Sequence, residues 1–342
     1  MDKRATRIGL GQRQARSVAR LSRQSWRALA SRQEIIILAC LVVAALVIGL
    51  WNPNFYQATN LLNLARGVSW FAVAALGVSM VILVGGIDLS VGAVMALAGV
   101  LCASALHAGL PVPLAILAGV AGGLGVGFLN GVLVARLGLP PFIVTLGTMG
   151  LVRGVTVGIT NGAPLRDLPP HFRALGQHDL YLGPLSVPLS LVIMALLAVL
   201  VSLLLDRTIL GRYIYTVGRD EQALRLVGVP SASVKITVYV LSGVLAACSG
   251  VLMTAWLGVA APTAAEGYEL EIIAAAVIGG ASLFGGEGGV LGVVLGTTLM
   301  LVVRNGFVFL GLPTYLQSGA IGAMILTVVL IDHLWRRRLA RG

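Results

Sequence analysis

Long apolar runs alternate with short polar segments along nearly the whole chain. Each run holds about 17 to 26 residues, and a helix needs about 20 apolar residues to cross a hydrocarbon core about 30 Å thick. The pattern predicts an all-α, polytopic transmembrane bundle. The ten expected spans are 34–51, 61–85, 88–108, 112–136, 141–160, 187–205, 235–258, 268–284, 287–310 and 314–334.

The basic residues predict the orientation of these spans. Nine of the 24 Lys and Arg residues lie in the first 33 positions, five between Arg207 and Lys235, and four between Arg336 and Arg341. Basic residues beside membrane spans mark the cytoplasmic side. An even number of spans places all three clusters on that side. We therefore expect a basic cytoplasmic tail (1–33), a transmembrane domain (34–334) with a large cytoplasmic loop (206–234), and a second cytoplasmic tail (335–342).

Composition agrees with a membrane protein and disfavours nucleic-acid binding. The 342 residues are 58% hydrophobic and 11% charged, whereas soluble domains carry about 25% charged residues. The net charge of +11 is explained by topology and by attraction to anionic lipid. Trp26 is the one aromatic residue in the basic tail, so the tail gives only a weak signal for nucleic-acid binding. The N-terminal region is expected to be a first anchor rather than a cleaved signal, because no small-residue cleavage site follows its apolar run.

Glycine has two patterns. Gly-rich breaks near Gly85 and Gly286 make the adjacent span boundaries weak and predict discontinuous helices, and the stretches around them weakly echo each other as two related halves. Elsewhere glycine recurs every four residues, which places it on one helix face where backbones can approach closely. Tight packing and a sliding interface are both compatible with this spacing. The glycines concerned are Gly119, Gly123, Gly127, Gly131, Gly288, Gly292 and Gly296.

Motifs for catalysis or nucleotide binding are absent from the sequence. A phosphate-binding loop ends in Gly-Lys-Ser/Thr, but the chain has only two lysines, Lys3 and Lys235, and neither follows such a turn. The four histidines show no metal-ligand spacing, the three cysteines lie inside apolar runs, and no Gly-x-Ser-x-Gly elbow occurs. We therefore expect no enzyme activity and no cofactor in this chain, so that another chain would hydrolyse any ATP that drives it.

Polar residues inside the spans are few. In "VGGIDLSVGAVMALAGV" Asp88 follows a Gly-Gly pair, where it could cap the next helix at the cytoplasmic end of a break, with help from Ser90. It could equally line a pathway or gate, because irregular backbone in a membrane occurs where it is buried or faces a cavity. Asn130 and Asn305 could bind a solute or bond helices together. Arg153 is given no role.

The segment "GRYIYTVGRDEQALRLVGVP" (211–230) is the most informative part of loop 206–234. Acidic residues at 220 and 221 suit a helix start, and Gly228 and Pro230 suit its end. The helix between them would expose a small apolar face made by Ala223, Leu224 and Val227. Such a helix suits docking into a partner's groove, although a connector lying on the membrane surface is an equal alternative.

Three segments together carry a resemblance. "GRYIYTVGRDEQALRLVGVPSASVKITVYVLSG", "VGGIDLSVGAVMALAG" and "GYELEIIAAAVIGGASLFGGEGGVLGVVLGT" resemble, in order, signatures of the ribose-type sugar permeases of ABC importers. The resemblance covers about 34–334 and leaves out the basic N-terminal tail. It implies a bacterial inner-membrane subunit, usually a homodimer in the lipid bilayer. An ATPase with often fused nucleotide-binding domains would bind ATP and Mg²⁺, and an extracytoplasmic binding protein would deliver the sugar.

The resemblance also implies roles for particular residues. The coupling loop would transmit ATP-driven closure to the spans through Gly211, Arg212, Gly218, Arg219, Glu221, Ala223, Leu224 and Gly228. The candidates for the translocation pathway or gate are Asp88, Ser90, Asn130 and Asn305. The expected function is import of a monosaccharide, ribose or a related polyol. The rival is a self-sufficient facilitator or secondary carrier, which would need coupling residues inside its spans.

Overall fold

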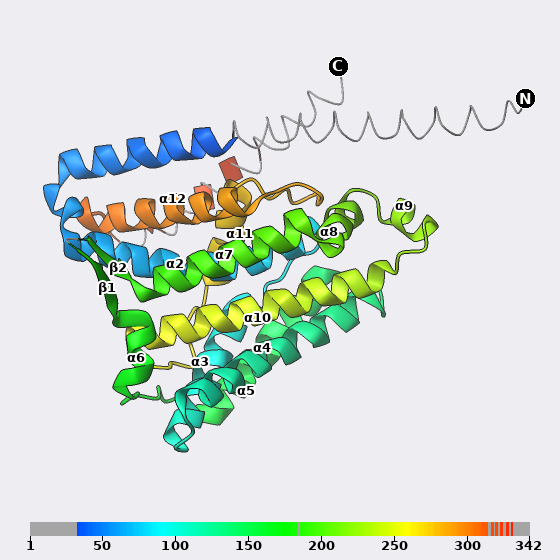
Figure 1. Ribbon diagram of the computed structural model, residues 1–342, viewed down its shortest axis with the longest axis horizontal. Helices are drawn as coiled ribbons and strands as arrows, with labels where there is room; N and C mark the ends of the chain where they lie inside the picture. Colours follow the sequence, from blue (N-terminus) through cyan, green and yellow to red (C-terminus); the bar gives the residue numbers. More distant parts are fainter. Residues whose placement is uncertain are drawn as a thin grey trace, which may run out of the picture.

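Long helices run roughly along one axis of the molecule (Figure 1). This computed structural model describes residues 33–183 and 185–313 and scattered positions between 316 and 330. Seven helices in that part of the chain are long and apolar enough to cross a membrane. They are Gln33–Trp51, α2 (Ala58–Leu83), α4 (Val112–Ala135), α5 (Pro141–Thr160), α7 (Leu189–Arg207), α10 (Ser231–Leu257) and α12 (Val290–Phe309). The expectation of a polytopic helical membrane protein is confirmed.

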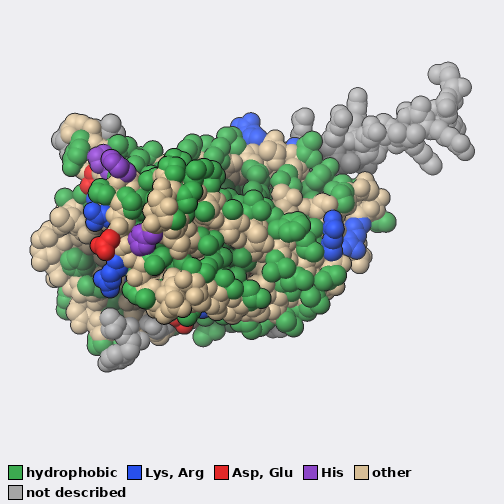
Figure 2. Space-filling view, turned by 90° about the horizontal axis from the view of Figure 1, so that it is seen from below, with side chains coloured by type: hydrophobic (Ala, Val, Ile, Leu, Met, Phe, Trp, Pro, Cys, Tyr) green, Lys and Arg blue, Asp and Glu red, His purple; other side chains and the backbone are tan. Residues whose placement is uncertain are grey.

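Helix α2 forms the centre of the bundle. In its most apolar 18-residue window, 89% of the residues are buried, and α7, α10 and α12 all pack against it. By contrast, α4, α5 and α7 expose many large apolar side chains, as lipid-facing helices do. Figure 2 shows this surface from below, with hydrophobic side chains over much of it and most of the charged ones near its two ends.

Glycines let α4 and α10 approach closely. A methyl group added at Gly123, Gly127 or Gly131 would collide with the backbone of α10, and one at Gly119 would meet Ala98 of α3 (Val91–His107). On the other side of the bundle Gly292 and Gly296 of α12 lie against α11 (Tyr268–Ile278). The sequence expectation placed Gly288 on the same helix face. That placement is wrong, because α12 begins only at Val290 and Gly288 belongs to the preceding turn.

Two of the expected spans are shorter as helices than predicted. The span 88–108 contains α3 with 17 residues, and the span 268–284 contains α11 with 11 residues. In both cases non-helical backbone next to a Gly-Gly pair replaces part of the helix, as irregular chain before α3 and as turns after α11. Non-helical backbone is tolerated at membrane depth when it is buried in protein. The composition of an apolar run therefore does not show whether all of it is helical. The expected span 314–334 lies mostly outside the described residues.

The two ends of the bundle carry different short elements (Figure 1). At one end lie η1 (Pro53–Tyr56), α6 (Pro170–Gln177) and a hairpin of β1 (Asp179–Leu182) and β2 (Leu185–Pro188). These elements give structure to most of the segment 161–186, which was expected to be an ordered or semi-ordered loop. At the other end lie α8 (Ile209–Arg219) and α9 (Glu221–Leu226). The small hairpin is the only sheet in the described part of the all-α bundle.

Candidate coupling and translocation sites

Loop 206–234 forms two helices, each with a side-chain cap. The hydroxyl of Thr208 accepts a hydrogen bond of 3.0 Å from the backbone N–H of Gly211 at the start of α8. A carboxylate oxygen of Asp220 accepts one of 2.9 Å from the N–H of Ala223 at the start of α9. Gly228 follows α9 with a φ of +79°, a left-handed conformation that suits glycine. The helix expected from 220 onward is therefore present, whereas α8 was not predicted.

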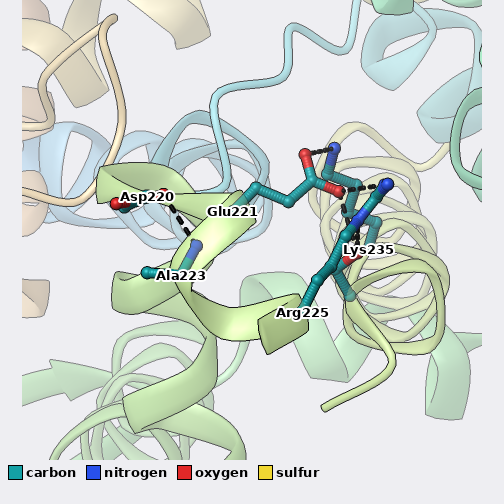
Figure 3. Close-up of polar contacts among 6 residues, drawn as sticks. Asp220, Glu221, Ala223, Arg225 and Lys235 are labelled. Atoms are coloured by element: carbon teal, nitrogen blue, oxygen red, sulfur yellow. Dashed lines mark hydrogen bonds and ion pairs between the residues drawn. The ribbon is translucent and has the colours of Figure 1, made fainter. Parts of the chain in front are cut away.

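Glu221 is the centre of an ionic cluster within the loop (Figure 3). Its Oε1 accepts hydrogen bonds from Arg225 and from Ser231, both at 2.8 Å, and its Oε2 accepts one from Lys235 at 2.7 Å. Burial acts to raise the pKa of Glu221, but the hydrogen bonds and charges of these partners outweigh it and lower the pKa to about 2. The cluster fixes α9 to the beginning of α10. Glu221 therefore points toward its own chain.

The apolar residues of α9 divide between two directions. Leu224 is 4% exposed and packs into the core, whereas Leu226 is 88% exposed and Val227 is 73% exposed. The expected outward face of Ala223, Leu224 and Val227 is therefore wrong for Leu224, because that side chain closes the contact with the bundle. Arg212 of α8 is also exposed. The surface that could receive a partner consists of Leu226, Val227 and the neighbouring charged residues.

Helix α8 rests on the end of α2 and on the second of two glycine-rich breaks. We define the first break as 84–90, between α2 and α3, and the second break as 279–289, between α11 and α12. The backbone N–H of Gly286 donates a hydrogen bond of 2.8 Å to the carbonyl of Leu83, which joins the second break to the end of α2. Gly218 of α8 lies directly over this junction, and a methyl group there would collide with both backbones. Only glycine fits at this crossing.

Two polar side chains of α8 add to this contact. The hydroxyl of Tyr215 donates to the carbonyl of Gly288 at 3.0 Å, and Nε of Arg219 donates to the carbonyl of Gly286 at 3.2 Å. Burial raises the pKa of Tyr215 to about 12, with Asp206 acting in the same direction and Arg219 against it, so its hydroxyl remains a donor near neutral pH. The loop is thus attached to the second break by main-chain acceptors.

Asp88 lies in a buried polar cluster at the first break. It is 3% exposed, and its Oδ1 accepts hydrogen bonds from the backbone N–H of Ser90 at 3.0 Å and from the hydroxyl of Ser90 at 2.6 Å. Its Oδ2 accepts one from Ser242 of α10 at 3.1 Å. The amide of Asn130, on α4, donates to the hydroxyl of Ser90 at 2.9 Å. The cluster joins the start of α3 to two neighbouring helices.

The first break enters the bundle more deeply than the sequence suggested. Asp88 was expected at the cytoplasmic end of the break, but it contacts Ser242, which lies about 17 Å along α10 from Ser231 at 1.5 Å per residue. Ser231 is the residue that contacts Glu221 in the loop. The backbone therefore turns back into the bundle after Gly85 and Gly86, and α3 starts inside it.

Asn305 does not join the Asp88 cluster. Its side-chain amide pairs with that of Asn60, with both hydrogen bonds at 3.1 Å, and this pair links α12 to α2. The structure thus brings Asp88, Ser90 and Asn130 together and leaves Asn305 elsewhere. Ser242 was missed because a lone Ser in an apolar run gives no signal, and Tyr215 was missed because α8, which carries it, was not predicted. In residues 33–183 and 185–313 no cluster of three His, Cys, Asp or Glu side chains could hold a metal ion.

Comparisons with known proteins find several similar permeases. The chain is 40% identical to the ribose import permease protein of Escherichia coli over 304 residues, which cover 87% of this chain and 92% of that protein. It is 38% identical to the ribose import permease protein of Bacillus subtilis, covering 86% and 90% of the two chains. It is 34% identical to the D-allose transport system permease protein of Escherichia coli, again covering 86% and 90%.

No solved structure matches the chain. Residues 60–329 match the family described as the branched-chain amino acid transport system / permease component, and these residues include the first break, loop 206–234 and the second break. The matched family and the relatives at 34–40% identity agree on a transport subunit rather than an enzyme. The chain therefore belongs to the permease component family of the branched-chain amino acid transport system.

Proposed function

We propose that this chain is the membrane permease of an ATP-driven importer for a monosaccharide, with ribose as the first candidate. The relatives named for ribose and D-allose import support a sugar as the substrate class. An extracytoplasmic binding protein would deliver the sugar, a separate ATPase would bind ATP and Mg²⁺, and a second copy of this chain would complete the pathway. These partners follow from the kind of transporter to which a permease component belongs.

The observation that carries the proposal is the position of α8. Asp220 alone separates it from α9, whose end exposes Leu226 and Val227, and it contacts the second break and the end of α2 through Gly218. A partner that grips α9 would therefore move a rigid element that is in direct contact with two discontinuous helices. Alternating access by movement of helix groups around such breaks is a known principle of transport.

We infer ten membrane crossings with both termini in the cytoplasm. Gln33, at the start of the first described helix, lies against Gly280 of the second break, which is the break that α8 contacts. The basic tail 1–33 would then share a side with loop 206–234, as the positive-inside rule demands. With α3 and α11 as partial crossings and 314–334 as the last one, the chain would return to that side. The relatives support a bacterial inner membrane as its location.

Within this proposal the Asp88 cluster positions α3. Asp88, Ser90 and Asn130 hold the start of a half-helix against α4 and α10, so that it moves with them. The pair of Asn305 and Asn60 would hold α12 to α2 in the same way. Arg212, exposed on α8, would meet the ATPase, and Gly211 permits the tight turn from α7 because a side chain there would strike the carbonyl of Leu205.

A purification experiment tests the docking surface. The tagged wild-type chain is extracted gently from its own membranes together with Leu226→Asp and, as a matched control, Leu137→Asp, which changes a 64% exposed leucine in the α4–α5 turn on the same side. We expect a stoichiometric ATPase with wild type and control, and about tenfold less with Leu226→Asp, since interface anchors dominate affinity. Glu221 is unsuitable for this test because it pairs within its own chain. Wild-type protein that purifies without an ATPase would favour the facilitator.

A further inference from the structure

Besides Asp88, four charged side chains lie together around one helix of the bundle. The exposed side chains of α4, α5 and α7 that lie between the helix ends are mainly large and apolar, for example Leu124, Leu151 and Leu200. Around α11, by contrast, α5, α11 and α12 contribute Arg153, Glu269, Glu271 and Arg304. Ionisable residues are costly in hydrocarbon and normally face a bundle interior or an aqueous cavity.

Arg304 makes the most contacts in this group. One of its nitrogens donates a hydrogen bond of 3.1 Å to Glu271, and another donates one of 3.0 Å to the hydroxyl of Tyr268. Its guanidinium carbon also lies 4.8 Å from the centre of the Tyr268 ring. The side chains of Arg304 and Glu271 are 29% and 16% exposed, so the pair is reachable from the surface of the subunit. Arg304 turns toward α11 instead of extending to the end of α12.

Arg153 approaches the same helix from α5. It donates hydrogen bonds to the carbonyls of Pro262 at 3.0 Å and Ala264 at 2.8 Å, which holds the segment 258–267, just before α11, against α5. It also interacts electrostatically with Glu269 and with the exposed Glu266. The four partly buried groups, Arg153, Glu269, Glu271 and Arg304, carry two positive and two negative charges. A balanced set of this kind suits a neutral polar solute better than an ion.

Two buried polar atoms beside this group have no hydrogen-bond partner. They are Oε2 of Glu269, an acceptor, and Nε1 of Trp70, a donor on a side chain that is only 5% exposed. The Trp70 ring stacks on that of Tyr268, with centroids 5.7 Å apart and planes at 18°. Buried polar atoms are nearly always paired in native structures, so each of these two atoms calls for a partner such as a ligand hydroxyl or a water molecule.

We infer that the surface of α11 lines the translocation pathway, and that Tyr268, Glu269, Glu271 and Arg304 bind the neutral sugar as it passes. We call these four residues the α11 polar wall. The carboxylates of Glu269 and Glu271 accept hydrogen bonds from sugar hydroxyls, and the guanidinium of Arg304 donates hydrogen bonds to the hydroxyl oxygens. Arg153 positions the segment 258–267. This inference rests on the proposed function for the identity of the solute, but the aqueous character of the surface does not.

Cysteine labelling tests the aqueous character. In a chain with Cys40, Cys102 and Cys248 changed to Ala, single cysteines replace Leu270, 58% exposed on α11, or Leu200, 51% exposed on α7. The assembled transporter in proteoliposomes is treated with a charged maleimide, with and without ATP. Because water and the reagent are excluded from lipid, we expect Leu270→Cys to react about tenfold faster in at least one condition. Equal, slow labelling at both positions in both conditions would overturn the inference.

Transport assays test the binding role. The variants are Glu271→Gln and Arg304→Gln, and the matched control is Arg66→Gln, which removes another partly buried ion pair, with Asp179 at 2.7 Å. The probes are radiolabelled D-ribose and D-allose, and ATP hydrolysis stimulated by the binding protein is measured in parallel. We expect about tenfold less sugar per ATP hydrolysed with the wall variants and less than about twofold change with the control.

The outcomes separate the two claims. A wild-type complex that imports neither sugar contradicts the proposed function, while the labelling contrast still decides whether the α11 surface is aqueous. A wild-type complex that imports sugar, with wall variants that import as much per ATP, contradicts the binding role alone. A loss of folded protein in Glu271→Gln would be seen in its ATP hydrolysis, and Tyr268→Phe, which removes only a hydroxyl, then replaces it with the same expectation.

Discussion

The two glycine-rich breaks are held in different ways. The first break, 84–90, is held from inside the bundle, where Asp88 and Ser90 bond to side chains of α4 and α10. The second break, 279–289, bonds to α8 through the carbonyls of Gly286 and Gly288, and to the end of α2 through one backbone N–H. The first break is therefore coupled to the core, and the second to loop 206–234.

This difference assigns the breaks different parts in transport. Four glycines of the second break have φ values between +72° and +149°, a conformation that is strained for other residues, so this backbone combines unusual turns with a direct link to α8. If the proposed function holds, a displacement of α8 would act on the second break first. It would then reach α12 and the α11 polar wall on either side of that break. The first break would keep α3 in place against α4 and α10.

The largest expected effect is that of Gly218→Val, which disturbs the point where α8, the end of α2 and the second break meet. The added side chain would collide with the carbonyl of Leu83 and the N–H of Gly286, and overpacking of this kind costs about 1–3 kcal/mol or more. We expect import to fall below detection. Gly150→Val, at a position with open space around it, is the control for adding a side chain. Normal uptake by Gly218→Val would show that α8 does not transmit movement to the second break.

The next largest effect is expected at the first break, where replacing Asp88 should lower the stability of the folded protein. Asp88→Leu leaves the donors of Ser90 and Ser242 without their acceptor, at about 1–3 kcal/mol for each unsatisfied group. Asp88→Asn keeps an acceptor for Ser90 and is expected to cost much less. Thermal unfolding of the purified protein measures both variants. If Asp88→Asn retained full stability but lost transport, the first break would be part of the moving pathway and the comparison would fail.

The smallest expected effect is the pH dependence of the Glu221 cluster. Because the pKa of Glu221 is lowered to about 2 from an ordinary value near 4.3, its stabilisation is complete above about pH 5 and is lost as the pH falls toward 2. Glu221→Gln should therefore lower stability by a constant amount, about 1 kcal/mol or less, between about pH 5 and 7. The difference from wild type should shrink below about pH 4. A difference that changes between pH 5 and 7 would contradict the assignment.

Much of the fold could be predicted from hydrophobic pattern alone. The spans that became α2, α4, α5, α7, α10 and α12 agree with their predicted ranges to within a few residues, because an apolar run of that length has few alternatives in a membrane. The pattern placed the end of this span at 284, whereas α11 ends at Ile278, because the chain turns at the glycine pair 279–280. Nor did it show α8, although Gly211, Ile214 and Val217 are buried at helical spacing.

The candidate sites were less predictable, because they depend on which helices pack against each other and not on local composition. Asp88, Ser90 and Asn130 were recognised as unusual polar residues, but their association depends on α4 and α10 coming together, which no local pattern encodes. Leu224 and Leu226 have the same side chain two positions apart, and only the packing of α9 decides which is buried. Gly218 was taken from the resemblance, and the structure adds the physical reason that a side chain there has no space.

Uptake into proteoliposomes tests the central claim most directly. The chain is reconstituted with its ATPase, and uptake of labelled D-ribose and D-allose is measured with the binding protein, the ATPase and ATP each omitted in turn. The account predicts that sugar accumulates only when all three are present, and that Gly218→Val abolishes accumulation while Gly150→Val does not. Equilibration of either sugar by this chain alone, without ATP, would contradict the account and identify a facilitator.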